Sequence, residues 1–214
     1  MAGTATELHI SGGNHITLPS RRKDSAANNF DRLDVIFVEA PLAKRPGKFE
    51  HLSNLVMVPL LVAALYLMLL GQKLFRIAGL HDSHLVYDLA EEYDAEIVEV
   101  DMDLFDVIDE YRLLWMLVHH GIVMLAIFAL PKVVATFQWV SIPVLVPSVF
   151  VAAAVLIFGA FATGTMAARD MRMAYDVKEY SEENPVEDAL LVIGALHRAG
   201  VKKRLQDSTQ VQIA

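Results

Sequence analysis

Two long apolar stretches in the second half of the chain restrict most strongly what it can fold into. Residues 113–131 contain no lysine, arginine, aspartate or glutamate, and residues 133–168 are uncharged throughout. A helix of about 20 residues, rising about 1.5 Å per residue, crosses the apolar core of a bilayer. We therefore predict a transmembrane helical hairpin over residues 113–163, joined by the segment from Lys132 to Ser141. Trp115 and Trp139 fall near the expected helix ends, where amphipathic rings prefer to lie.

The composition agrees with a membrane protein and excludes several classes of site and partner. Hydrophobic residues make up 55% of the 214 positions, which is high for a soluble domain. We therefore expect membrane lipid to be a partner. The formal net charge of -8 argues against nucleic acid, because phosphates require a basic surface. Since the chain has no cysteine, any metal would need histidine, carboxylate and water ligands.

The segments on either side of the hairpin have the pattern of an α/β fold. Four short segments predict strands: residues 7–11, which alternate, residues 34–39 and 189–193, which are apolar runs, and residues 95–103, which end in carboxylates. Residues 21–33 have the spacing of an amphipathic helix. Continuously apolar runs are typical of buried parallel strands, so we expect a small, mainly parallel sheet with flanking helices. This α/β domain would be divided by the hairpin: residues 1–112 precede it, residues 164–208 supply its last helix and strand, and residues 209–214 form a tail.

Two Gly-x-x-His sequences directly follow predicted strands. Gly12 to His15 follows the first strand and Gly194 to His197 the last, while Glu39 ends the second. Ligands of open parallel sheets bind beyond the carboxyl ends of the strands, so these side chains are expected at one edge. Each histidine can alternatively be interpreted as a polar residue in a strand-end turn, and only a shared edge favours a functional role.

These residues resemble the motifs of the TraB/Tiki family, whose wider superfamily includes haem-binding ChaN-type proteins and erythromycin esterases. The order and approximate spacing of the motifs match over most of the chain. The family often has an arginine between the two acidic residues after the third strand, where this chain has Met102. The matching segments are Gly12-Gly-Asn-His15, Val35-Ile-Phe-Val-Glu39, Asp101-Met-Asp103, Arg169-Asp170 with Met173-Ala174, and Leu191-Val-Ile-Gly194-Ala-Leu-His197.

The resemblance implies a membrane-anchored, metal-dependent hydrolase of the peptidase type, acting on a peptide or small-molecule substrate. By resemblance, His15, Glu39 and His197 would bind a divalent metal (manganese, cobalt or zinc), with Glu39 and Arg169 catalytic. The supporting residues would be Gly12, Asp101, Asp103, Asp170 and Gly194. The alternative is a non-catalytic membrane protein that binds haem or a peptide at the same edge in a regulatory or interaction role.

Membrane topology limits these predictions. His15 and His197 can meet only if an even number of crossings separates them. The uncharged stretch from Leu52 to Gln72 is long enough to cross, yet we expect it to lie on the membrane or pack on the domain. The basic residues Arg112, Arg169 and Arg172 flank the hairpin, so the positive-inside rule predicts cytoplasmic termini, with the plasma membrane as the location. The sequence leaves a homo-oligomer open.

Overall fold

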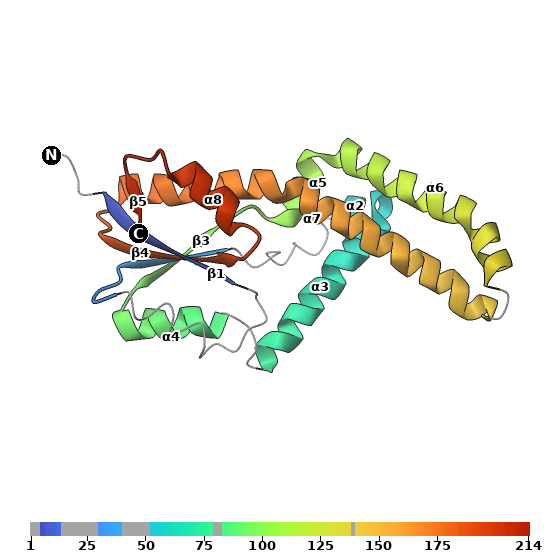
Figure 1. Ribbon diagram of the computed structural model, residues 1–214, viewed down its shortest axis with the longest axis horizontal. Coiled ribbons are helices and arrows are strands. Elements are labelled where there is room, and N and C mark those ends of the chain that lie inside the picture. Colours follow the sequence, from blue (N-terminus) through green and yellow to red (C-terminus); the bar gives the residue numbers. More distant parts are fainter. Residues whose placement is uncertain (1–4, 14–29, 40–51, 79–82, 138–139) are drawn as a thin grey trace. The chain divides into compact units, whose positions relative to one another are not determined.

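The computed structural model describes residues 5–13, 30–39, 52–78, 83–137 and 140–214. Within these residues the chain is an α/β protein with a five-stranded parallel sheet and seven helices (Figure 1). The chain divides into two compact units. The first comprises Met1–Leu42, Gly71–Met102 and Met166–Ala214, and the second comprises Ala43–Leu70 and Asp103–Thr165.

The first unit holds the sheet. Its strands are β1 (Thr6–Gly13), β2 (Val35–Glu39), β3 (Glu96–Val100), β4 (Asp188–Gly194) and β5 (Val211–Ile213). Their order across the sheet is β3-β2-β4-β1-β5, and all neighbours pair in parallel. The expected parallel sheet is therefore confirmed. Strand β4, whose core residues 189–193 are all buried, lies at its centre, which explains its continuously apolar sequence.

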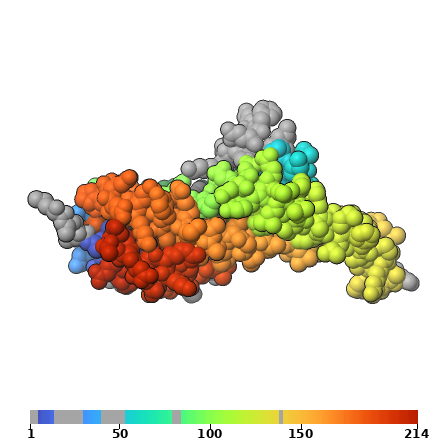
Figure 2. Space-filling model, turned by 90° about the horizontal axis from the view of Figure 1, so that it is seen from above, coloured from blue at the N-terminus to red at the C-terminus, as the bar shows by residue number. Residues whose placement is uncertain are grey.

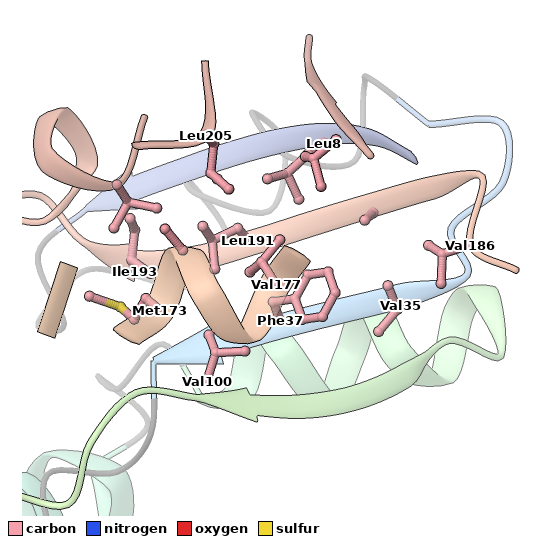
Figure 3. Close-up of a cluster of buried hydrophobic side chains, with 14 residues drawn as sticks. Leu8, Val35, Phe37, Val100, Met173, Val177, Val186, Leu191, Ile193 and Leu205 are labelled. Carbon is pink, nitrogen blue, oxygen red and sulfur yellow. The ribbon is translucent and has the colours of Figure 1, made fainter. Parts of the chain in front are cut away.

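Helices cover both faces of this sheet, because alternate residues of each strand point to opposite faces. Helices α8 (Arg198–Leu205) and the C-terminal part of α7 (Ile142–Glu183) pack on one face, and α4 (Ser83–Tyr93) packs on the other (Figure 1). Leu191 and Ile193 of β4 enter the first core together with Met173 and Val177 of α7 (Figure 3). The second core combines Leu190 and Val192 with Phe30, Leu33, Ile36, Leu85, Val86, Leu89 and Ala95.

The predicted tail at residues 209–214 is an edge strand instead. Strand β5 pairs with β1 in the register Thr6↔Val211 to Leu8↔Ile213. Val211 is buried, while Gln212 between it and Ile213 is exposed. This alternation over only three residues is too short to distinguish a strand from a frayed end by sequence.

The second unit is helical. It contains α2 (Leu52–Met57), the first half of α3 (Pro59–Ile77), α5 (Leu104–Glu110), α6 (Arg112–Thr136) and the N-terminal part of α7. Helices α6 and α7 lie side by side (Figures 1 and 2), and their contact includes the rings of Trp115 and Phe161, with centroids 4.8 Å apart. The last helix expected within residues 164–208 is the direct continuation of the apolar part of α7.

Three helices in the described part of the chain are long and apolar enough to cross a membrane: α3, α6 and α7. Two of them, α6 and α7, correspond to the predicted hairpin. The third, α3, covers most of the stretch that we expected to lie on the membrane or to pack on the domain. By length and composition alone α3 qualifies as a crossing helix.

Candidate functional site

The carboxyl ends of the central strands carry the predicted motifs to one edge of the sheet. Gly13 of β1 lies opposite Gly194 of β4, and Val38 of β2 lies opposite Val192 of β4. Glu39 is thus one residue further along β2, beside the end of β4. His15 itself lies outside the described residues, as does most of the predicted helix at residues 21–33.

Glu39 is buried and both of its carboxylate oxygens accept hydrogen bonds. The Nη2 group of Arg169 donates to Oε1 at 2.6 Å, and the backbone N–H of Gly194 donates to Oε2 at 2.7 Å. Because Gly194 ends β4 next to β2, its N–H points at the neighbouring strand end. The contribution of Gly194 to the site in this structure is therefore a backbone donor.

Arg169 joins Glu39 to Asp101. Its Nε donates to Oδ2 of Asp101 at 3.0 Å, and its Nη2 contacts the same oxygen. Asp101 follows β3 with a φ of 137°, a backbone conformation that is costly for a residue with a side chain. The N–H of Asp101 donates to the carboxylate of Asp176 at 3.3 Å, and the N–H of Met102 donates to the carboxylate of Asp101 at 2.6 Å. These two hydrogen bonds offset part of that cost.

The positive charge of Arg169 lies in hydrogen-bonding contact with the carboxylates of Glu39 and Asp101. Arg169 lies in the charged part of α7, after its uncharged segment ends at residue 168. Burial by itself would lower the pKa of Arg169, but the hydrogen bonds and charges of Asp101 and Glu39 raise it, so the guanidinium stays charged. Burial raises the pKa of Asp101, and the hydrogen bond and charge of Arg169 oppose that shift.

His197 is held by Asp170. Its Nδ1 lies 2.6 Å from Oδ1 of Asp170, and both side chains are buried. When Nδ1 carries the proton, the lone pair of Nε2 is left available, and Nε2 lies 3.7 Å from Oε1 of Glu39. A carboxylate on the far nitrogen is the usual second-sphere partner of a metal-binding histidine.

The spacing of Glu39 and His197 fits a shared divalent ion. Two ligands bound at about 2.1 Å with tetrahedral geometry are about 3.4 Å apart, close to the observed 3.7 Å between Nε2 and Oε1. Arg169 donates to that same oxygen, so an ion would share it with a guanidinium. No group of three potential ligands is present in the part of the chain that the structure describes. A third ligand from His15 would complete the predicted set.

The other predicted residues have local structural roles. Asp103 belongs to the second unit, where its carboxylate accepts the N–H of Phe105 at 2.8 Å and caps α5. Gly12 faces Arg198: a Cβ on this glycine would lie 2.9 Å from Cδ of that side chain. Gly12 therefore leaves room for an arginine directly after His197.

Sequence reasoning missed Gly200 as a site residue. A Cβ at this position would lie 1.7 Å from Oδ2 of Asp170, so only glycine lets α8 approach the carboxylate that holds His197. Gly200 follows His197 by three residues, as His197 follows Gly194, and this Gly-x-x-His-x-x-Gly spacing was the available signal.

No protein-family model, curated protein or solved structure matches this chain. The geometry of its own residues is therefore the basis for a functional conclusion.

Proposed function

We propose that the protein is a membrane-anchored, metal-dependent hydrolase. The observation that carries this proposal is the buried approach of His197 Nε2 to Glu39 Oε1, at 3.7 Å, with Asp170 on the opposite nitrogen. His15 is the proposed third ligand, because the strands that lead to the two Gly-x-x-His sequences are direct neighbours in the sheet. A peptide substrate, and membership of the TraB/Tiki family, are proposed on the sequence resemblance alone.

In this proposal each described side chain has a distinct task. Asp170 keeps the proton of His197 on Nδ1, so that Nε2 faces the site. Glu39 would hold the ion together with Nε2 of His197 and would accept a proton from water, while Arg169 and the Gly194 N–H hold its carboxylate in place. A divalent ion bound there would polarise the scissile carbonyl and lower the pKa of water toward about 7. Manganese, cobalt and zinc all accept such nitrogen and oxygen ligands.

The proposed anchor is the α6–α7 hairpin in the plasma membrane. Both helices are long and apolar enough to cross, and two crossings return the chain to the side of the sheet. The basic residues Arg112 and Arg172 at the hairpin ends favour a cytoplasmic α/β unit with both termini inside.

Metal analysis of the purified protein tests the chemistry. We expect the wild type to bind one manganese, cobalt or zinc ion per chain, and His197→Ala and His15→Ala each to lose it. His84→Ala is the matched control and should retain the metal, since the exposed His84 ring lies 3.1 Å from the Arg76 carbonyl oxygen and is not among the predicted ligands. Stoichiometric metal in both site variants would contradict the proposal.

One observation favours the alternative, a non-catalytic protein that binds haem or a peptide at the same edge. Both oxygens of Glu39 already have donors within the chain, as a structural ion pair would. In that case the wild type would be free of metal, and added manganese, cobalt or zinc would leave its melting temperature unchanged. Haem or peptide titration would then show binding that depends on His197.

A further inference from the structure

We propose that helix α3 is a lipid-binding helix that lies along one leaflet of the membrane and does not cross it. Its exposed apolar stripe would contact acyl chains, and Lys73 and Arg76 would contact anionic headgroups. This inference rests on the proposed insertion of α6 and α7, and it is independent of the proposed hydrolase chemistry.

Strand pairing prevents α3 from crossing. Strand β2 precedes α3 and β3 follows it, and the two strands pair along five residues, from Val35↔Glu96 to Glu39↔Val100. Paired strands lie on the same side of a membrane, so the chain between them must cross an even number of times. Of the described helices between β2 and β3, only α3 is long enough. Residues 40–51 contain four charged side chains and residues 79–82 are too few, so the sequence supplies no second crossing.

The surface of α3 is nevertheless that of a lipid-exposed helix. Four large aliphatic residues form a stripe with helical spacing of three, four and three residues: Leu67, Leu70, Leu74 and Ile77, with exposed fractions of 69%, 54%, 59% and 75%. A continuous exposed stripe of this kind requires an apolar partner. At about 100° per residue, Leu61, Val62 and Leu65, which are buried, lie on the other side of the helix.

The start of α3 is attached to α6. Pro59 has no N–H and interrupts the backbone ladder after Val58, and the N–H of Leu60 donates instead to Nε2 of His119 at 3.2 Å. His119 lies seven residues into α6, about 10 Å from its first residue. In this proposal the first crossing after β3 is α6 itself, because only the short α5 precedes it, so the start of α6 and the attached start of α3 belong to the leaflet on the side of β3.

The charges near the C-terminal end of α3 select the kind of lipid. Lys73 and Arg76 are exposed and no acidic residue occurs in the helix. Long basic side chains at the end of an apolar helix reach the headgroup layer and are attracted to anionic lipids. The stripe and the two cations together fit an anionic bilayer surface, continuous with the lipid around α6 and α7.

Single-cysteine labelling can test this arrangement directly, because the chain has no natural cysteine. The variants Ala78→Cys, Phe137→Cys and Ala214→Cys would be reconstituted in vesicles and treated with a membrane-impermeant maleimide from each side. We expect Ala78→Cys and Ala214→Cys to react from the same side, and Phe137→Cys from the other. Phe137 reports on the hairpin separately, so failure of the anchor and failure of the α3 proposal are distinguishable.

Spin labels on α3 test the lipid contact. In vesicles of phosphatidylglycerol and phosphatidylcholine, labels at Leu67, Leu70 and Leu74 should be more accessible to oxygen than to a water-soluble nickel complex, and labels at Lys73 and Arg76 the reverse. The double variant Lys73→Glu/Arg76→Glu should lose part of this burial in anionic vesicles, with no change in pure phosphatidylcholine.

Three results would overturn the proposal. Labelling of Ala78→Cys from the side opposite Ala214→Cys would show that α3 crosses. Equal access of the nickel complex to the stripe and to Lys73 would show that the stripe faces water. Efficient disulfide formation between two Leu70→Cys chains would show that a second copy covers the stripe.

Discussion

At the scale of single residues, the site depends on close approaches that leave no space for additional atoms. Asp170 holds His197 at 2.6 Å, and Gly200 lies against the other oxygen of the same carboxylate. The Nη1 atom of Arg204 is 3.9 Å from that oxygen, Oδ2 of Asp170. Three residues outside the Gly194 to His197 motif therefore control the orientation of His197: Asp170 on α7, and Gly200 and Arg204 on α8.

The substitution Gly200→Ala should displace Asp170 and release His197. The added Cβ would lie 1.7 Å from a carboxylate oxygen, so the carboxylate or the helix must move. We expect a loss of about 1–3 kcal/mol in the free energy of unfolding, as in other overpacked sites. Nitrogen NMR of His197 should show a changed tautomer population, and bound metal should decrease.

Gly121→Ala is the matched control for that variant. Gly121 lies inside α6, and apart from the backbone of its own helix no atom of the described residues lies within 4 Å of a Cβ built there. Alanine is favoured over glycine in a helix by about 0.5–1 kcal/mol, so this variant should be as stable as the wild type or more so. A normal His197 tautomer in Gly200→Ala would contradict the proposed role of Gly200.

Asp34 makes the stability of the sheet depend on pH in the acidic range. Its carboxylate accepts the N–H groups of Glu187 and Asp188, at 2.9 and 3.1 Å, and pairs with Arg32. Desolvation raises the pKa of Asp34, but these hydrogen bonds and the Arg32 charge outweigh it, so the pKa is lowered in the folded protein. The contribution of Asp34 is complete above its unfolded pKa of about 3.9 and is lost as the pH falls through the lower, folded pKa.

Asp34→Ala should therefore destabilise the protein at pH 7 and have a smaller effect at low pH. Loss of hydrogen bonds to a charged group costs about 1.5–3 kcal/mol. Asp34→Asn keeps one side-chain oxygen as an acceptor, so its free energy of unfolding at pH 7 should lie between those of the wild type and Asp34→Ala. Urea unfolding at pH 7 and pH 3 measures the difference, and an equal effect of Asp34→Ala at both pH values would contradict this explanation.

At the scale of secondary-structure elements, His119 connects two apolar helices by a specific tautomer. Its Nε2 accepts the Leu60 N–H, so the proton lies on Nδ1, which is 3.0 Å from Nδ1 of His120. His119 is buried, whereas His120 is exposed. Both histidines lie within the predicted hairpin, but the partner of His119 on α3 depends on the break at Pro59.

Replacing His119 should loosen the start of α3. In His119→Leu the Leu60 N–H would lose its acceptor, at an expected cost of about 1–3 kcal/mol for an unsatisfied buried donor. His120→Leu, the control, leaves that bond in place and should change stability by less. Thermal unfolding in detergent micelles gives the comparison, and hydrogen exchange at Leu60 should be faster only in His119→Leu.

At the scale of the whole molecule, the chain divides into two compact units. The first unit contains both cores of the sheet and all of the described side chains around Glu39. Asp101 and Arg169 hydrogen-bond across the point where the chain leaves for the second unit and returns. A short linker can therefore join Met102 to Met166, where the first unit is interrupted and resumes.

Replacement of residues 103–165 by a short glycine-serine linker should leave the α/β unit folded. We expect circular dichroism to retain the signal of the parallel sheet, and His197 to keep its tautomer. The shortened protein should still bind anionic vesicles through α3, but alkaline carbonate should remove it from them. The full chain should resist that treatment. An unfolded product would show that the sheet requires residues 103–165.

The sequence by itself determined the features that depend on local chemistry. Residue period and apolar length were enough to predict parallel strands ending at Glu39 and Ile193 and two long apolar helices. These follow from backbone hydrogen bonding and side-chain alternation within each segment.

The tertiary structure alone decided which groups pair across long sequence separations. The ion pair of Glu39 with Arg169, 130 positions further along the chain, the contact of Gly200 with Asp170 and the strand at residues 211–213 could not be predicted locally. Each joins segments that are distant in the chain, through the order of the strands or through the packing of α8 against α7. The same strand order places β2 beside β3 and so constrains α3, for which hydropathy alone favoured a crossing.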